Sequence, residues 1–164
     1  MTRGTPVSVF EVEKEDEEMN TPVTVRFMRM DDGAPIPTSA RPGDAAVDLA
    51  SMEEVTLMPR ERTVVGTGLA VEIPPGYAGF VFARSSLGFR CGVSLINGVG
   101  VIDSGYRGEI RAALINHSDQ PIGFCRGDRI AQLVIQRVPE VEFAEVWELA
   151  PSVRGAGGYG STGR

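Results

Sequence analysis

Asp103 is the side chain in this sequence best placed by its neighbours for acid–base chemistry. It ends the run 97–103, in which two glycines would let a flat ligand approach the backbone closely. Because Val101 and Ile102 precede it, its carboxylate is expected to be half-buried, and such a group beside bound water is a suitable general base. The alternative is a turn residue ahead of Ser104 and Gly105. The residues alone leave both interpretations open.

Two further residues lie on either side of this run. Asn97 opens the hairpin, whose backbone N–H and C=O groups could read the edge of a base. Tyr106 lies just beyond the hairpin, where its ring could pack on a sugar face and leave no space for an extra hydroxyl. A tyrosine that stacks in a core or on a hairpin is the commoner case. Both interpretations stay open here as well.

A second group of residues offers ligands for phosphates. Arg84, Ser85 and Ser86 follow an apolar run and supply a guanidinium, two hydroxyls and backbone N–H groups. The same Ser-Ser-Leu-Gly run also occurs in ordinary turns and helix caps. The Gln132 amide can donate to a phosphate oxygen and accept from water. Asp48, set between two apolar residues, could hold Mg²⁺ through a water molecule, as is common at triphosphates.

Arg129 and the C-terminus carry less specific expectations. Arg129 is expected to be structural and to pair with Asp128 or another carboxylate. The segment 154–163 is rich in glycine and cannot form a core element. It is either a disordered tail or a mobile arm that closes over a phosphate-bearing ligand.

The elements that must position these residues are short strands. Runs of Val, Ile, Leu and Phe are broken by Gly, Pro and Asp, and no window predicts a long amphipathic helix, although residues 84–89 are expected to form a turn or two. Many short strands joined by such turns predict an all-β sandwich or jelly-roll barrel. The predicted strands are 23–29, 45–50, 54–58, 62–73, 78–83, 93–96, 99–102, 109–115, 121–125, 128–137 and 141–147.

Composition restricts the class of protein. The chain has 164 residues, which suits one folded domain over 21–150, an acidic N-terminal extension over 1–20 expected to be disordered, and a flexible arm over 151–164. A net charge of −6 argues against nucleic acid as a partner. No apolar run reaches the length of a membrane span, and two cysteines are too few for a disulfide framework. A soluble cytoplasmic protein without a membrane partner is expected.

The candidate segments, taken in order, resemble the five sequence motifs of the trimeric dUTPase family. Any one of these motifs is weak evidence, whereas all five in order over a β-rich chain are strong evidence. They are residues 45–49 (AAVDL), 84–88 (RSSLG), 100–110 (GVIDSGYRGEI), 127–133 (GDRIAQL) and the arm 154–163.

The resemblance implies a jelly-roll-like β subunit, of the dUTPase-like β-clip type, in a homotrimer with exchanged C-terminal arms and shared active sites. The family hydrolyses dUTP to dUMP and pyrophosphate with Mg²⁺, which supplies dUMP for dTTP synthesis and keeps uracil out of DNA. By motif position, Asp103 would activate the attacking water and Asp48 would hold the water shell of Mg²⁺. The phosphates would be contacted by Arg84, Ser85, Ser86, Gln132, Arg154, Ser161 and Thr162, and the uracil and deoxyribose by Asn97, Val101, Ile102, Asp103, Tyr106, Arg111 and Tyr159.

Three positions depart from the family pattern. Ala46 and Ser86 stand where the family usually has glycine, and Tyr159 stands where it usually has phenylalanine. The methyl group of Ala46 is small, so a shift rather than a loss is expected there, and stacking on a base survives with Tyr159. The run Arg-Ser-Ser-Leu around Ser86 also occurs in the related dCTP deaminases. These departures predict adjusted geometry with the chemistry kept.

Two rival functions are compatible with parts of the pattern. A dCTP deaminase on the same fold would carry a catalytic glutamate in the strand after residues 100–110, where this chain has Ala113. A nucleotide-binding or signalling protein without turnover would have little use for a water-activating carboxylate, which Asp103 would provide. The sequence therefore favours the hydrolase.

Overall fold

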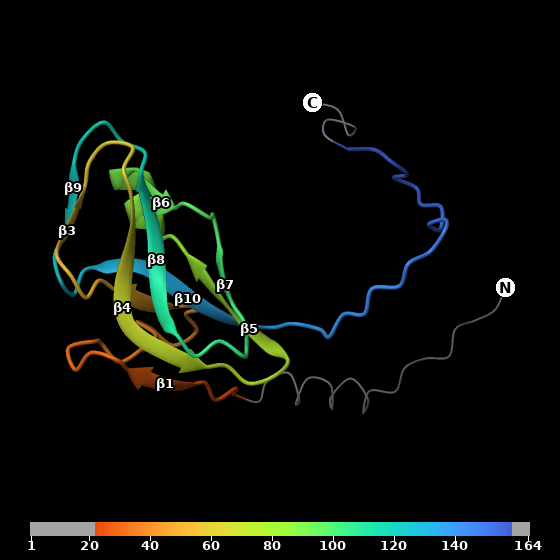
Figure 1. The fold of residues 1–164 in the computed structure, drawn as a ribbon, viewed down its shortest axis with the longest axis horizontal. Helices are drawn as coiled ribbons and strands as arrows, with labels where there is room; N and C mark the ends of the chain where they lie inside the picture. The colour runs from red at the N-terminus through yellow and green to blue at the C-terminus, as the bar shows by residue number, and fades with distance from the viewer. Residues whose placement is uncertain (1–21, 159–164) are drawn as a thin grey trace.

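The computed structural model describes residues 22–158. Within that range the chain forms ten strands and one π-helical turn, so the predicted all-β class is confirmed (Figure 1). Short strands are what the sequence dictates, because Gly, Pro and Asp interrupt each apolar run within a few residues. The elements are β1 Arg26–Arg29, β2 Val47–Ala50, β3 Val55–Leu57, β4 Arg62–Glu72, β5 Tyr77–Phe82, η1 Leu87–Cys91, β6 Val93–Leu95, β7 Gly100–Ile102, β8 Glu109–Asn116, β9 Ile122–Phe124 and β10 Arg129–Arg137.

The strands form two four-stranded antiparallel sheets and a small two-stranded one. One sheet has the order β1-β4-β8-β6, the second has the order β2-β10-β5-β7, and β3 pairs with β9. Strands far apart in sequence thus become neighbours: β10 lies between β2 and β5, with Gln132 paired to Asp48 on one side and to Phe82 on the other. This register brings the predicted phosphate ligands of three segments to one place.

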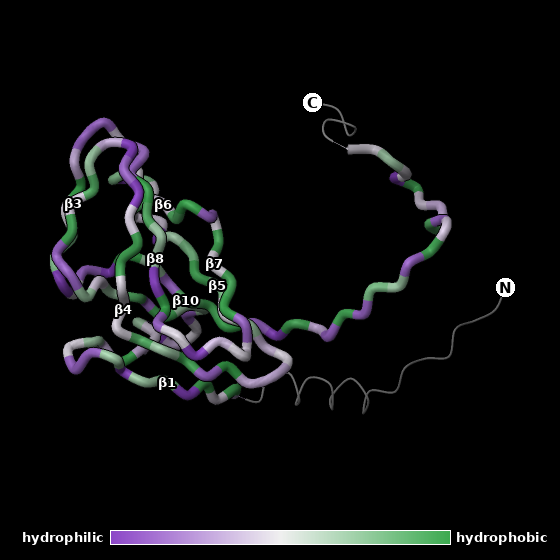
Figure 2. The backbone as a smooth tube through the Cα atoms, viewed as in Figure 1, coloured by the Kyte–Doolittle hydropathy of each residue, from purple (hydrophilic) through white to green (hydrophobic). Residues whose placement is uncertain are grey.

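The core lies between the two large sheets. On β8, Ile110, Ala112 and Leu114 are buried while the alternate residues are more exposed, the period-two pattern of a sheet with one face on the core. They share one apolar cluster with residues of the opposite sheet such as Leu49 and Leu133. Figure 2 shows the same alternation of apolar and polar residues along the strands. Every second side chain on these strands therefore fills the core, and the alternate side chains remain available at the surface.

A salt bridge fastens the turn before β10 to the loop after β1. Arg126 Nη2 lies 2.6 Å from Asp31 Oδ1, and Arg126 also donates to the Met52 carbonyl. The hydrogen bond from Arg126, with a second from the Gly33 backbone, lowers the pKa of the Asp31 carboxyl. Backbone bonds between Ser51 and the turn residues 127 and 128 complete this clamp. The start of β10 is thereby held against the end of β2.

One predicted strand is absent from the structure. Residues 141–147 do not form a strand: they run away from the sheets, and Phe143 and Trp147 are 94% and 106% exposed (Figure 1). A strand needs a hydrogen-bonding neighbour, and among residues 22–158 none pairs with this segment. The helical turn predicted at 84–89 is confirmed, because residues 85 and 86 are helical and lead directly into η1. No helix among the described residues is long and apolar enough to cross a membrane.

Candidate functional site

The predicted site residues gather around two separate cavities. One, of ≈ 280 Å³, is lined by residues of β7, β8 and the turn between them, and we call it the nucleoside cavity. The other, of ≈ 770 Å³, is lined by residues of β2, β10 and the loop after β5, and we call it the phosphate cavity. The two share none of their lining residues. The residues of the predicted site thus fall into two groups around different cavities of one chain.

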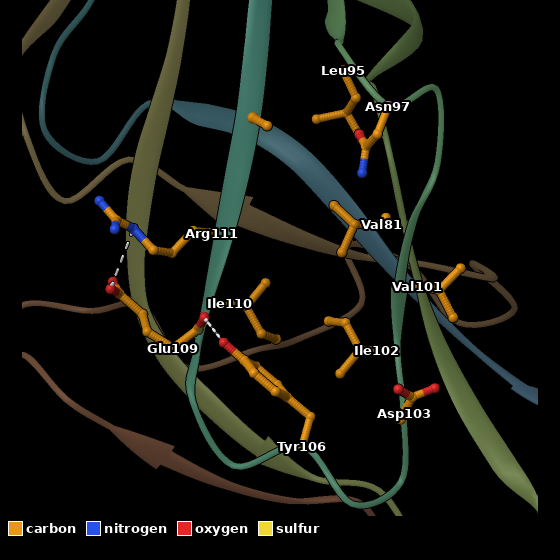
Figure 3. Close-up of a pocket in the computed structure, with 12 residues that line it drawn as sticks. Val81, Leu95, Asn97, Val101, Ile102, Asp103, Tyr106, Glu109, Ile110 and Arg111 are labelled. Atoms are coloured by element: carbon orange, nitrogen blue, oxygen red, sulfur yellow. Dashed lines mark hydrogen bonds and ion pairs between the residues drawn. The ribbon is translucent and has the colours of Figure 1, made fainter.

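The nucleoside cavity brings together side chains from three segments (Figure 3). Asn97 points its amide into it from the loop after β6, and Asp103 lies at the end of β7 with its carboxylate exposed. Ile102 is buried at 7% exposure, whereas Val101, one residue earlier on β7, is 63% exposed on the other side of the strand. Asp103 follows a buried residue, as expected, but its own side chain is open to solvent.

Tyr106 forms the lower wall of this cavity. Its hydroxyl donates to the Glu109 carbonyl oxygen at 2.9 Å, and its ring lies near Ile102 and Ile110 in the view of Figure 3. The side chain is 45% exposed, so part of the ring faces the cavity. The ring therefore forms part of the cavity wall and is not a core residue, while its contact with a sugar stays a prediction.

Arg111 lies at the far rim. Its guanidinium is turned toward Glu109, with 3.8 Å between Nε and the Glu109 Oε2 atom. The other carboxylate oxygen of Glu109 accepts the Gly68 backbone N–H at 2.9 Å across the bulge of β4. Sequence reasoning missed Glu109, because a glutamate at the start of a strand is ordinary in sequence. In the fold it anchors both Arg111 and the turn that carries Tyr106.

The phosphate cavity is built around Asp48. Its Oδ1 accepts from Arg84 Nε at 2.8 Å and its Oδ2 from Arg129 Nη1 at 2.9 Å, so both carboxylate oxygens are engaged. Asp48 and Arg84 are the more sheltered of the three, at 27% and 21% side-chain exposure, against 56% for Arg129. Arg129 was expected to pair with Asp128 or another carboxylate, and the carboxylate is Asp48. Asp128 instead accepts the Cys125 backbone N–H.

The remaining ligands of this cavity come from strand ends. Gln132, opposite Asp48 on β10, donates its amide to the Ala83 carbonyl at 3.1 Å. That bond holds the chain just ahead of Arg84, from which the exposed Ser85 and Ser86 lead into η1. Hydroxyls and guanidinium groups thus border one open space together with the carboxylates of Asp44 and Asp48. No trio of His, Cys, Asp or Glu side chains suited to a metal occurs within residues 22–158.

The pairing of β5 with β7 fixes the separation of the two cavities. Ile102, just before Asp103, pairs with Gly79, and the phosphate cavity begins beyond Phe82 at the other end of β5. The stretch from Gly79 to Phe82 alone spans about 10 Å at about 3.3 Å per residue. Asp103 and Arg84 lie beyond that stretch in opposite directions. The nucleoside cavity is thus lined in part from β5 and the phosphate cavity from the loop after it, and the two share no lining residue.

The C-terminal arm is described in part. Arg154 forms a local turn in which Nε donates to the Gly157 carbonyl at 3.0 Å, away from both cavities. Tyr159, Ser161 and Thr162 lie outside the described residues. Residues 151–158 therefore line neither cavity of their own chain.

Known proteins similar to this chain identify its family. A model of the dUTPase family matches residues 32–163. The chain belongs to the dUTPase family. A deoxyuridine 5'-triphosphate nucleotidohydrolase of Nocardia farcinica is 52% identical over 144 residues, which cover 87% of this chain and 86% of that protein. One of Thermobifida fusca is 51% identical over 142 residues, covering 86% and 79%.

Solved dUTPase structures share the fold. The dUTPase of Staphylococcus bacteriophage 80alpha with dUpNHpp superposes with a TM-score of 0.81 at 29% identity, covering 86% of this chain and 99% of that one. A mutant dUTPase from phage phi11 of S. aureus, described with a structural Mg(II) ion, gives a TM-score of 0.71 at 28% identity and covers 76% and 97%. The jelly-roll-like fold expected for this dUTPase is thereby confirmed.

Proposed function

We propose that this dUTPase hydrolyses dUTP to dUMP and pyrophosphate at sites built from the nucleoside cavity of one subunit and the phosphate cavity of another. The observation that carries the proposal is the convergence of Asn97, Asp103 and Tyr106 on one cavity, with Arg84 and Gln132 lining a different one. The two cavities share no lining residues, which is compatible with a site completed by a second copy, as the family resemblance implies. A homotrimer with three such sites follows from the family resemblance.

In this mechanism Asp103 acts as the general base. Its exposed carboxylate takes a proton from a water molecule, whose oxygen attacks the α-phosphorus. The bond from that phosphorus to the oxygen bridging to the β-phosphate then breaks, and pyrophosphate leaves. Such a reaction depends on charge neutralisation and alignment of the water more than on a covalent nucleophile.

The other predicted site residues are proposed to hold the substrate around this carboxylate. Four of them border the phosphate cavity and carry donors for the phosphate oxygens: Arg84, Ser85, Ser86 and Gln132. The predicted site residues of the arm would close the site, with the Tyr159 ring on the uracil. They are Arg154, Tyr159, Ser161 and Thr162. Asn97 and the backbone of β7 would read the base, and the walls and rim of the same cavity are Val101, Ile102 and Arg111.

The residues around Asp48 fit a magnesium ion held mainly by its waters and by the substrate. A carboxylate beside phosphate-binding groups suits Mg²⁺, which keeps several waters and is usually bound by one or two carboxylates plus substrate phosphates at triphosphates. Asp48 would hold the ion through water, and the ion would supply neutralisation of the phosphate charge. The two unpaired cysteines, Cys91 and Cys125, are consistent with the cytoplasm as the proposed compartment.

The deaminase alternative finds no support at β8. Ala113 lines the nucleoside cavity at the place where a deaminase would need its glutamate. Glu109, the carboxylate on the same strand that does reach the cavity, is engaged by Gly68 and Arg111. This strand therefore offers a bound base no free carboxylate to activate a water at its exocyclic amine.

The test is pyrophosphate release from dUTP, dCTP, dTTP and UTP, measured in parallel with Mg²⁺ and with EDTA. Fast Mg²⁺-dependent release from dUTP alone is expected, because a fixed backbone pattern and a closed sugar wall discriminate at both ends of the nucleoside. Ammonia from dCTP would instead establish deamination, and no turnover of any of the four would leave a binding protein.

A further inference from the structure

The position of the Tyr106 ring is fixed from two sides. Its hydroxyl is held by the Glu109 carbonyl oxygen at 2.9 Å. Its hydroxyl end also lies against the backbone of the turn, at Gly108. A methyl group at residue 108 would lie 2.7 Å from Tyr106 Cζ and 3.0 Å from Cε2, and would also overlap the hydroxyl. Carbon atoms in proteins do not approach that closely, so the ring occupies the space a side chain at 108 would take.

The backbone itself does not require glycine at this position. Gly108 is not one of the glycines with a positive φ, so its main chain adopts a conformation open to any residue. Neighbouring Gly105, in the same turn, also lacks a positive φ, and a Cβ added to it would meet no atom within 4 Å. Two glycines three residues apart therefore differ in one respect: the tyrosine ring fills the side-chain position of the second alone.

We propose that Gly108 is a specificity-determining residue, because its missing side chain is the recess that holds the Tyr106 ring at the sugar end of the nucleoside cavity. The proposal rests on the proposed function, in which that ring excludes ribonucleotides. It assigns the discrimination between dUTP and UTP to two residues: Tyr106, which supplies the ring, and Gly108, which leaves the recess. Tyr106 contacts the sugar, and Gly108 acts through Tyr106.

A fixed ring matters because other ways of rejecting a substrate with one extra hydroxyl are weak. A pocket that merely adds or removes contact area discriminates against an added hydroxyl by about a hundredfold at best. Steric exclusion by a ring works only if the ring cannot retreat, and displacements of about 1 Å have large effects on enzymatic selectivity and rate. The recess at Gly108 and the carbonyl of Glu109 together deny the ring that freedom. A methyl at 108 must push the ring out of this position.

The experiment compares Gly108→Ala with Gly105→Ala as the matched control. For each variant, kcat/KM is measured with dUTP and with UTP, and folding is checked by circular dichroism and thermal melting. Gly108→Ala is expected to lower the dUTP/UTP ratio of kcat/KM by at least about tenfold. Gly105→Ala is expected to keep the wild-type ratio. An unchanged ratio in Gly108→Ala, or an equal fall in both substrates, would overturn the proposal.

A double-mutant cycle with Tyr106→Ala separates this role from a general structural one. Once the ring is gone, the three atoms nearest a methyl at 108 are gone too, so Gly108→Ala should not change the dUTP/UTP ratio further. If Gly108→Ala alone fails to fold, the double variant should fold, and its failure to do so would refute the assignment. Failure of the proposed function is distinguished from failure of this inference before any variant is made, because the wild-type protein would then not hydrolyse dUTP.

Discussion

Replacing Asp48 by asparagine tests whether this carboxylate serves the phosphate cavity apart from any metal. In the structure Asp48 holds Arg84 by a 2.8 Å bond to Nε and is itself held by Arg129. Asparagine keeps the shape and one acceptor but loses the charge. We expect Arg84 to lose its fixed orientation, and with it part of its grip on a phosphate, even when Mg²⁺ is removed.

The size of the expected change in affinity follows from how exposed the Asp48 and Arg84 side chains are. A hydrogen bond to a charged group contributes about 1.5–3 kcal/mol when sheltered, and an exposed ion pair about 0–1 kcal/mol. Asp48 and Arg84 are 27% and 21% exposed, which places the pair between these cases. A loss of about 1.4 kcal/mol corresponds to a tenfold weaker affinity. We therefore expect Asp48→Asn to raise the Kd for dUpNHpp about tenfold in EDTA.

Isothermal titration calorimetry with dUpNHpp, in EDTA and in Mg²⁺, measures this change. The matched control is Asp44→Asn: Asp44 borders the same cavity, but its carboxylate accepts the Arg41 backbone N–H rather than an arginine side chain. A carboxylate whose only task is to hold a metal would repel the triphosphate when the metal is absent. Equal or tighter binding by Asp48→Asn in EDTA would therefore refute the reasoning.

Three further predictions concern the base, the arm and the clamp. Asp103→Asn is expected to lower kcat by about 10²–10⁴-fold while dUpNHpp still binds, and unchanged turnover in a pyrophosphate assay would remove Asp103 from the base role. Deleting 154–164 is expected to leave the thermal melting temperature and the oligomeric mass intact but activity very weak. Loss of the oligomer on size-exclusion chromatography would show that the arm is structural instead. Because the pKa of Asp31 is lowered by Arg126, this pair stabilises the fold above the ordinary carboxyl value of 3.8 and less as pH falls through the lowered pKa. The stability gap between wild type and Asp31→Asn should thus shrink on acidification below that value, and a gap in the melting temperature that is independent of pH would contradict this.

Local sequence patterns predicted most strands because each strand is short and bounded by its own turn residues. β10 was expected at 128–137 and spans Arg129–Arg137, with β4 expected at 62–73 and found at Arg62–Glu72. Alternation on one face is sufficient evidence where a partner strand exists. At 141–147 the same alternation was misleading, because periodicity says nothing about whether the same chain supplies a neighbour for the backbone.

The site was predictable as a set of residues and not as an arrangement. Tyr106, Asp103 and Asn97 could be named because their motif is contiguous, and they do share a cavity. The partner of Arg129 could not be named, since Asp48 lies 81 positions earlier and only the pairing of β2 with β10 brings the two together. The recess at Gly108 was equally hidden, because a glycine in a turn looks the same in sequence whether a ring or solvent fills its side-chain position.

The sequence by itself determined the all-β class, the motifs and the chemistry that their residue types allow, because these depend on neighbours along the chain. Only the tertiary structure decided which charges pair, which wall the Tyr106 ring forms, and that the nucleoside and phosphate cavities lie apart on one subunit. Those features depend on strand order and register, which arise from burying two sheets against each other across long sequence separations. The shared site is thus a proposal that the fold makes possible and the sequence alone did not require.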